Sequence, residues 1–448
     1  MRDTRKVIVF AISSFLLLII ASLLSIVFKF SWEPFNKINL LADIIKQDTV
    51  QTKKDTAVAV EPVPVIPEKN FDLYLTPSLI TSFLNDSVGI GLPHLMSQLR
   101  AQDTGNKRKI RIAYFGDSMI EGDLLTQTIR ELMQKRFGGR GVGFVPITSQ
   151  VSKFRQTVTC DYSGGWQDLN FKSSARKNRL FLSGHLFSGN NQWVQMTDQT
   201  LGDSVSVLEK YLLAGPVSAG TFSVNGQAQN TTASTPFNQI LIGKDANRKI
   251  EVRALTDTIP VYGISFESAD GVIVDNFSFR GITGVELNNI DTAFLKQIAA
   301  ARTYDLIVFQ YGVNLLFRPN DMDFSWYGKL IRPVMRKFKT AFPNSDLLII
   351  STADRAFRYG EQYQSAKGID SLIKTQALLA YEEGWSFYNL YATMGGRNSI
   401  VRWAQQEPPH ANKDYVHPNQ KGAEVLGRLF FEAVMQDYNK QQKLILKK

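Results

Sequence analysis

Ser118 is the first residue whose type and setting suit nucleophilic chemistry. It lies in the segment FGDSMIEGD, directly after a strand-like run and directly before a predicted helix. Backbone amides at a helix start carry partial positive charge, so they would favour an oxyanion beside this serine. Gly116 permits a tight turn that a larger side chain would obstruct. A serine at this place is also a common helix cap, so the segment alone leaves both interpretations open.

A carboxylate and an imidazole lie close together near the end of the chain. Asp414 and His417 are three residues apart in DYVHPNQKGAEVLG, so a turn or short helix would place both side chains on one side. A carboxylate that fixes the imidazole tautomer leaves the other ring nitrogen to accept a serine proton, as in a Ser-His-Asp triad. One alternative is a surface histidine beside a helix-capping aspartate. Another is a metal site that adds His410, but no zinc-type framework accompanies these residues. With Ser118 in the same chain, the pair predicts acid–base catalysis.

Two further segments could supply donors for an oxyanion. QYGVNLL follows the predicted strand DLIVF, so Asn314 is expected at the carboxyl edge of a sheet, where open α/β sheets bind ligands. Its side-chain amide could donate to a developing negative charge. RGITGVEL, residues 280–287, offers the backbone amide of Gly284 after the strand FSF. Either residue taken alone would more often be an ordinary turn residue.

An alternation of strand-like and helix-like segments is expected to position these residues. Compact apolar runs occur at residues 110–116, 305–312, 346–352 and 385–391, separated by segments of helix length. This order of elements is typical of a parallel sheet that is covered by helices on both faces. The sequence therefore predicts an α/β domain.

A different pattern interrupts this domain at about residues 152–276. Short alternating runs such as TFSVNG, KIEVRA, VYGISFES and GVIVDNFSF lie between clusters of Gly, Asn, Asp and Ser, with almost no helical pattern. This is typical of a β-sandwich. We therefore predict an inserted all-β module over these residues, with the α/β domain in two parts, 71–151 and 277–448.

The N-terminal residues 7–28 form an uncharged apolar run. A helix of about 20 such residues spans the ~30 Å hydrocarbon core of a membrane. A cleaved signal peptide is the alternative, but its apolar core is shorter, at roughly 7–15 residues, and the small-residue cleavage site is absent from KFSWEPF. We predict an uncleaved single-pass anchor in the cytoplasmic membrane, after a cytoplasmic tail of residues 1–6. The catalytic domain would then be periplasmic or otherwise extracytoplasmic, beyond a proline-containing spacer at residues 29–70.

The composition excludes several classes of function. With 44% hydrophobic and 21% charged residues among 448, the chain is neither wholly disordered nor a polytopic membrane protein. Lys and Arg number 51 against 41 Asp and Glu, but the basic residues are scattered and no nucleic-acid partner is expected. The single cysteine, Cys160, excludes an intrachain disulfide and multi-cysteine metal sites. No cofactor and no metal are expected.

Together the motifs resemble the four blocks of the SGNH (GDSL-type) hydrolase superfamily. GDS contains Ser118, GITG contains Gly284, GVN contains Asn314, and the DxxH pair is Asp414 and His417. The resemblance implies a flavodoxin-like three-layer α/β fold with Ser118 as nucleophile and Asp414 and His417 as its triad partners. It also implies an oxyanion hole formed by the amides of Ser118, Gly284 and Asn314.

The resemblance covers roughly residues 92–438 and has one departure. The third block usually has an aspartate where this chain has Leu315. The departure affects the expected hydrogen bonds that support Asn314 and not the expected activity. The context of Ser118 and the β-rich insertion are similar to exported bacterial polysaccharide and peptidoglycan O-acetylesterases. In those relatives the insertion resembles a carbohydrate-binding module.

The resulting hypothesis is a membrane-anchored extracytoplasmic serine esterase that removes acetyl groups from an envelope polysaccharide or peptidoglycan. Its expected partners are the acetylated glycan and the membrane. One alternative is an O-acetyltransferase of the same fold, which would use a membrane-bound O-acyltransferase as a partner. The other alternative is a catalytically idle glycan-binding scaffold, which would not need Ser118, Asp414 and His417 together.

Overall fold

The computed structural model describes residues 2–27, 67–85, 89–173, 179–200 and 206–445, in two units, Met1–Val65 and Ile66–Lys448. The first unit is described by one helix, α1 (Arg2–Val27). Among the described residues, no helix has both the length and the apolarity needed to cross a membrane. The last residue of the predicted anchor, Phe28, and the predicted spacer up to residue 66 lie outside the described residues. The anchor remains a prediction from the sequence.

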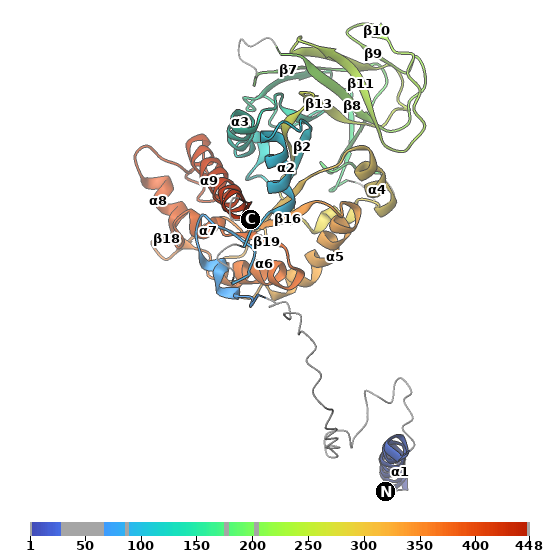
Figure 1. The fold of residues 1–448 in the computed structure, drawn as a ribbon, viewed down its shortest axis with the longest axis vertical. Helices are drawn as coiled ribbons and strands as arrows, with labels where there is room; N and C mark the ends of the chain where they lie inside the picture. The colour runs from blue at the N-terminus through green and yellow to red at the C-terminus, as the bar shows by residue number, and fades with distance from the viewer. Residues whose placement is uncertain (1, 28–66, 86–88, 174–178, 201–205, 446–448) are drawn as a thin grey trace, which may run out of the picture. The chain divides into compact units, whose positions relative to one another are not determined.

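The second unit contains a six-stranded sheet (Figure 1). Its strands, in spatial order, are β1 (Ile80–Thr81), β19 (Ser386–Tyr388), β16 (Asp346–Ile350), β15 (Leu306–Gln310), β2 (Lys109–Gly116) and β14 (Gly271–Ser278). The edge strand β1 is antiparallel to β19, and the other neighbouring pairs are parallel. Numbered along the chain, the parallel strands have the order 2-1-3-4-5, which is the flavodoxin-like order. The predicted flavodoxin-like α/β fold is confirmed.

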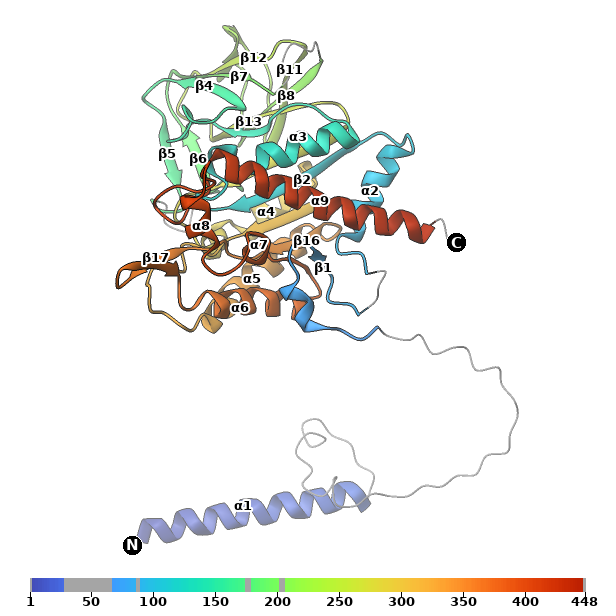
Figure 2. The ribbon, with the colours of Figure 1, turned by 90° about the vertical axis from the view of Figure 1, so that its left-hand side faces the viewer.

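Helices cover both faces of this sheet (Figure 2). One layer contains α2 (Pro93–Asp103), α3 (Thr126–Phe137) and α9 (Gln420–Ile445), and the other contains α4 (Thr292–Ala301), α5 (Ser325–Ala341) and α6 (Ile369–Glu383). In β2, Ile112 and Tyr114 face the first layer, whereas Ala113 and Phe115 face the second. A strand covered on both faces is apolar at every position, which explains the compact apolar runs in the sequence.

Short elements connect these layers. They are the 3-10 helices η2 (Phe71–Leu75), η3 (Glu121–Asp123) and η4 (Val285–Asn289), the helices α7 (Leu390–Thr393) and α8 (Ser399–Gln405), and the hairpin of β17 (Ala356–Tyr359) and β18 (Gln362–Ser365).

The part of the chain between α3 and β14 forms two antiparallel sheets that pack as a sandwich (Figure 1). The first sheet has the order β10 (Gln227–Ala228), β9 (Phe222–Val224), β12 (Lys249–Ala254), β7 (Gln192–Asp198) and β4 (Val158–Tyr162). The second has β11 (Asn238–Asp245), β8 (Leu208–Ala214), β13 (Val261–Glu267), β6 (His185–Ser188) and β5 (Gln167–Asn170), and β3 (Gly143–Pro146) also pairs with β13. Val194 and Val252 of the first sheet share a buried core with Leu212 and Ile264 of the second.

The observed limits of the sandwich differ from the predicted limits of the insertion, residues 152–276. Because β3 pairs with β13, the β-rich part begins before residue 152. At the other end, the segment GVIVDNFSF is predicted as a sandwich strand, but β14 pairs with β2 along its whole length and belongs to the parallel sheet. This part of the prediction is wrong because an apolar run of this length fits a buried parallel strand as well as a sandwich strand.

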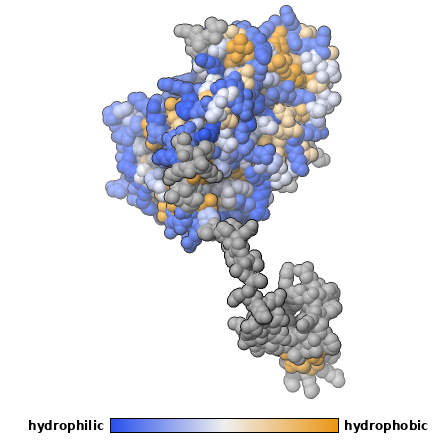
Figure 3. Space-filling view, in the orientation of Figure 1, coloured by the Kyte–Doolittle hydropathy of each residue, from blue (hydrophilic) through white to orange (hydrophobic). Residues whose placement is uncertain are grey.

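The second sandwich sheet covers apolar surface of the α/β domain. Phe144 lies 5.1 Å from Phe277 of β14, and Tyr262 lies 5.8 Å from Phe294 of α4, measured between ring centroids. These rings belong to one buried core that also contains the α5 and α6 side chains. The outer surface seen in Figure 3 is mainly hydrophilic, with apolar residues in small groups on the sandwich. The sandwich and the α/β domain therefore share a hydrophobic core.

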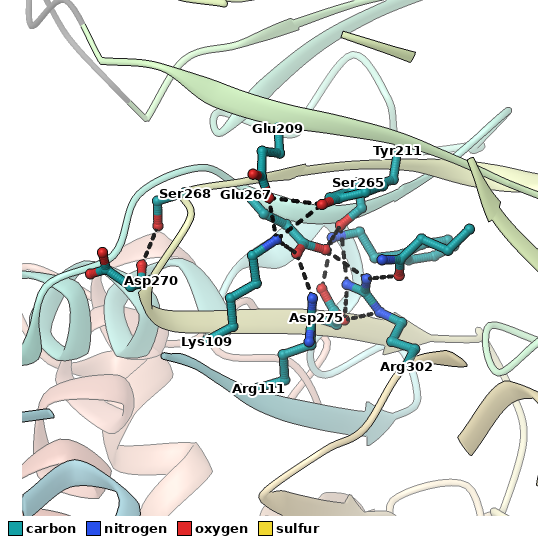
Figure 4. Close-up of polar contacts among 12 residues, drawn as sticks. Lys109, Arg111, Glu209, Tyr211, Ser265, Glu267, Ser268, Asp270, Asp275 and Arg302 are labelled. Atoms are coloured by element: carbon teal, nitrogen blue, oxygen red, sulfur yellow. Dashed lines mark hydrogen bonds and ion pairs between the residues drawn. The ribbon is translucent and has the colours of Figure 1, made fainter. Parts of the chain in front are cut away.

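A buried ionic network joins the same two parts (Figure 4). Arg302, which follows α4, is fully buried and bonds Glu267 of β13 and Asp275 of β14, each at 2.6 Å. Lys109 and Arg111 of β2 reach Glu267 at 2.9 and 2.8 Å. Burial by itself raises the pKa of Glu267, but these three cations hold that pKa well below its usual range. The sandwich is thus tied to the α/β domain by the fully buried charges of Arg302, Glu267 and Asp275 and by two partly buried cations.

Candidate active site

Ser118 lies in a turn directly after β2, half-buried, with its Oγ 2.8 Å from Nε2 of His417. The predicted helix start beside Ser118 is wrong, because α3 begins only at Thr126. Gly122 and Asp123 have positive φ angles, 71° and 69°, which interrupt any longer α-helix there. Stabilisation of an oxyanion at Ser118 must therefore come from individual amides and not from the end of α3.

His417 and Asp414 lie in the loop before α9. His417 Nδ1 is 2.7 Å from Asp414 Oδ2, and the backbone amides of Val416 and His417 donate to Asp414 Oδ1 at 3.0 and 3.1 Å. Burial raises the pKa of Asp414, but these hydrogen bonds outweigh it and lower the pKa to about 2. An ionised carboxylate only accepts, so Nδ1 carries the proton and Nε2 accepts from the Ser118 hydroxyl. The three side chains thus have the geometry of a Ser-His-Asp triad.

The loop that presents Asp414 and His417 is held by contacts from distant parts of the chain. The Ala356 amide donates to the Tyr415 carbonyl at 3.0 Å, and the ring of Tyr363 stacks on the ring of Tyr415 at 4.1 Å. Both of these partners belong to the β17–β18 hairpin. The hairpin therefore helps to hold the loop that contains Asp414 and His417, and no local pattern in the sequence predicts this contact.

Asn314 follows β15 and reaches the residue that precedes Ser118. Its side-chain amide donates to Asp117 Oδ2 at 3.0 Å and to the Ile282 carbonyl at 2.9 Å. The amide has two hydrogens, and both are used in these bonds, so donation to an oxyanion requires one of them to be exchanged. Leu315, the departure from the family pattern, is 4% exposed and packs in the core beneath α5 and α6.

Gly284 lies in the loop after β14 and has a positive φ of 90°. A Cβ at this position would lie 2.7 Å from the ring of Tyr311, so only glycine fits. The bond from Asn314 to Ile282 links this loop to the loop after β15. The structure thus places the Gly284 loop beside Asn314 and supplies a steric reason for glycine, while a catalytic role of its amide stays a prediction.

Asp117 is a residue of this site to which the sequence analysis assigns no role. It is 1% exposed and accepts hydrogen bonds from the Met119 amide at 2.9 Å and from Asn314. Burial raises the pKa of Asp117 to about 7, although the Met119 amide, His417 and Asn314 oppose this shift. The only sequence signal was its place before Ser118, which does not distinguish a buried carboxylate from an exposed one.

The stability of the protein is expected to depend on pH through Asp117. An aspartate in the unfolded chain titrates at about 3.9, whereas the pKa of Asp117 in the folded protein is about 7. The bound proton stabilises the fold fully below about pH 4, and this contribution is lost as the pH rises to about 7. Asp117→Asn should therefore gain thermal stability relative to the wild type between pH 4 and pH 7. Melting temperatures measured by circular dichroism at several pH values check this, and a constant difference would contradict it.

A pocket of about 320 Å³ lies beside Ser118 and His417. Its lining also includes Arg280, after β14, and Val151 and Phe154, in the segment between β3 and β4. The Phe154 residue is 79% exposed. Phe154 belongs to the predicted insertion, so the insertion contributes a wall of this pocket although the predicted catalytic residues all lie outside it.

The fold can be compared with known proteins. No protein-family model matches this sequence, and no curated protein matches it. A solved structure of a peptidoglycan O-acetylesterase is similar with a TM-score of 0.66 at 21% sequence identity, over 77% of this chain and 96% of that chain. This likeness establishes a shared fold, including the β-rich sheets. The likeness is one of fold, and it agrees with the α/β architecture predicted from the sequence.

Two other solved structures are more distant. An acetyl xylan esterase has a TM-score of 0.28 at 15% identity, over 36% of this chain and 81% of that chain. A putative GDSL-like lipase from Parabacteroides merdae has a TM-score of 0.27 at 18% identity, over 37% of this chain and 73% of that chain. At these scores the likeness supports no structural conclusion.

Proposed function

We propose that this protein is a serine esterase that removes O-acetyl groups from an envelope polysaccharide or peptidoglycan. The observation that carries the proposal is the hydrogen-bonded series from Ser118 through His417 to Asp414, with heavy-atom distances of 2.8 and 2.7 Å. It lies at the carboxyl edge of a 2-1-3-4-5 sheet, beside the point where the strand order reverses. The shared fold with a peptidoglycan O-acetylesterase supports the choice of acetylated glycan.

In this mechanism Ser118 Oγ attacks the carbonyl carbon of the acetyl ester while His417 Nε2 takes the hydroxyl proton. Asp414 holds the imidazole and stabilises its positive charge. Collapse of the tetrahedral intermediate breaks the bond to the sugar oxygen, which receives the proton from His417. Water then attacks the acetyl group on Ser118, with His417 again as the base, and releases acetate and the free serine.

The negative charge of the tetrahedral intermediate needs donors near Ser118. We assign this role to the backbone amides of Ser118 and Gly284 and to the side chain of Asn314. Asn314 would exchange its bond to Asp117 or Ile282 for a bond to the oxyanion, since both amide hydrogens are otherwise used.

Asn314→Ala is expected to lower kcat for an acetyl ester by ~10²–10³ with little change in KM, because one oxyanion donor is lost. Steady-state kinetics with 4-nitrophenyl acetate measure both constants. Asn389→Ala is the matched control, because the Asn389 side chain also links loops, through hydrogen bonds to Tyr74 and Ala392, but bonds neither Asp117 nor a triad residue. An effect of Asn314→Ala on KM alone would show that Asn314 binds substrate and does not stabilise the transition state.

The proposed function is tested by separating hydrolysis from its alternatives. A fluorophosphonate probe should label the wild type and fail to label Ser118→Ala, which excludes an idle scaffold. One activated acetyl donor, supplied with an acceptor glycan, then distinguishes acetate release from acetyl transfer. Hydrolysis predicts mainly acetate, and mainly acetyl-sugar would identify an acetyltransferase.

We propose that the enzyme acts outside the cytoplasm and is held at the membrane by residues 7–28. The support is the uncharged apolar run in the sequence. Carbonate extraction of membranes tests the anchor, because an integral segment stays in the pellet and a peripheral protein is released.

A further inference from the structure

An exposed aromatic ring lies at the rim of the pocket beside Ser118. Phe154 lines this pocket together with Ser118 and His417, and it is 79% exposed. Single exposed apolar side chains are common on protein surfaces and need no explanation by themselves. Phe154 differs from these because a substrate that reaches Ser118 extends along the walls of the same pocket. Its position therefore suits contact with the substrate.

The turn that contains Phe154 is anchored to the loop after Ser118. The amides of Phe154 and Arg155 both donate to the Val151 carbonyl, at 2.9 and 3.2 Å. The Arg155 side chain is 9% exposed and pairs with the buried Asp123 at 3.4 Å. Asp123 ends η3, which follows Ser118 in the chain. The backbone of Phe154 is thus in place before a substrate binds, which lowers the entropic cost of a contact with it.

The lining of the pocket is partly apolar and partly polar. Val151 and Phe154 supply apolar surface, whereas Glu121, Arg280 and Asn412 supply polar groups. Glu121 and Arg280 form an ion pair with each other, so their charges offset each other. A pyranose ring combines the same two features, because its faces consist of C–H groups and its edge has hydroxyl groups. The lining therefore matches a sugar ring better than a wholly apolar or an ionic group.

The size of the pocket also exceeds the needs of the acetyl group. An acetyl group has only two carbon atoms, whereas the pocket has a volume of about 320 Å³. The remaining space is available to the alcohol part of the ester, which is the part that differs from one acetyl ester to another. A residue of the rim can therefore distinguish between substrates.

We propose that Phe154 is a specificity-determining residue whose ring stacks on a C–H face of the sugar unit that bears the acetyl group. The proposal rests on the proposed esterase function and narrows its substrates to acetyl esters of pyranose sugars. The stacked sugar brings its ester carbonyl to Ser118 Oγ. The chemical step itself belongs to Ser118, His417 and Asp414, so Phe154 acts on substrate binding.

Phe154→Ala is expected to lower kcat/KM for an acetylated glycan by about tenfold, mainly through KM, because one stacking contact is lost. The glycans are acetylated xylo-oligosaccharide and O-acetylated muramic-acid glycan strands, and the better substrate of the two is used. Hydrolysis of ethyl acetate, which has no ring to stack, should stay within about twofold of the wild type. Acetate release measures both reactions. An equal loss on both esters, or no loss on the glycan, would overturn the proposal.

Phe317→Ala is the matched control. Phe317 is also an exposed phenylalanine, at 58%, but it does not line this pocket. Its removal should leave hydrolysis of both esters close to the wild type. A loss on the glycan as large as that of Phe154→Ala would show that the effect is not specific to the pocket.

Two further substitutions separate stacking from simple apolar bulk. Phe154→Trp keeps a flat aromatic face and should retain most of the activity on the glycan. Phe154→Leu keeps apolar volume without that face and should resemble Phe154→Ala. Wild-type activity of Phe154→Leu would contradict stacking. Because Phe154 is 79% exposed, none of these variants should lower the melting temperature, and a lower value with equal losses on both esters would show a structural role.

Binding to the Ser118→Ala variant of the full chain, measured by calorimetry, tests Phe154 without any need for catalysis. Addition of Phe154→Ala should weaken the affinity for the same glycan about tenfold, whereas addition of Phe317→Ala should not. If this holds and the wild type hydrolyses no acetyl ester, the stacking role stands and the esterase function fails. If the wild type hydrolyses the glycan but Phe154→Ala leaves the affinity unchanged, the stacking role alone fails. Binding of neither glycan would also overturn the proposal.

Discussion

Ser118→Ala and His417→Ala are each expected to lower kcat/KM for acetyl ester hydrolysis by about four to six orders of magnitude. Residues of a triad act as a unit, so removal of either one abolishes the nucleophile or its base. Ser118 Oγ lies 2.8 Å from His417 Nε2, which is the distance of a hydrogen bond ready for proton transfer. Hydrolysis of 4-nitrophenyl acetate and acetate release from an acetylated polysaccharide both measure the effect.

The chain offers a matched control for His417. His94 also pairs with a carboxylate, Asp305, at 3.0 Å, and its side chain is 28% exposed, close to the 30% of His417. His94→Ala should therefore leave ester hydrolysis within a few-fold of the wild type. Asp414→Asn should cost less than loss of Ser118 or His417, because Asp414 only orients and stabilises the imidazole. Near-normal turnover by Ser118→Ala would show that the triad assignment is wrong.

Arg302→Met is expected to lower the free energy of unfolding by about 3–5 kcal/mol, the usual cost of leaving buried charges without their partner. Glu267 and Asp275 would each lose a 2.6 Å ion pair in a place that water does not reach. Urea denaturation followed by tryptophan fluorescence measures the change. The surface pair of Arg253 and Glu251 is the control, since Arg253 Nη2 lies 3.6 Å from Glu251 Oε1 and the Arg253 side chain is 34% exposed. Arg253→Met should cost less than about 1 kcal/mol.

Arg302→Lys keeps the prediction testable if Arg302→Met does not fold. Lysine retains the charge but loses the planar fork that contacts two carboxylates at once, so an intermediate loss of stability is expected. Equal stability of Arg302→Met and the surface control would mean that Glu267 and Asp275 do not depend on Arg302. Deletion of the whole sandwich would not test its role in isolation. It would also expose Phe277 and Phe294, which pack against rings of the sandwich.

Much of the α/β domain and the candidate triad could be predicted from the sequence because both depend on local patterns. The strands after residues 110, 305, 346 and 385 are buried on both faces, so each is an uninterrupted apolar run that can be recognised by itself. Asp414 and His417 lie three residues apart, so any turn brings them together. The membrane anchor also rests on a local apolar run, and it remains a prediction.

Tertiary structure alone decided the features that depend on partners far away in the chain. The apolar sequence of β14 does not indicate which strand it pairs with. Only the observed pairing with β2 assigns it to the parallel sheet and not to the sandwich. The sequence predicts that the side-chain amide of Asn314 can donate, but only the folded chain shows that Asp117 and Ile282 accept both of its hydrogens. Burial, ion pairing and the choice of hydrogen-bond partner arise when distant segments pack together, so they cannot be predicted from one segment alone. For this reason the sequence indicated the chemistry of Ser118, whereas the place of Phe154 at the rim of its pocket became visible only in the folded chain.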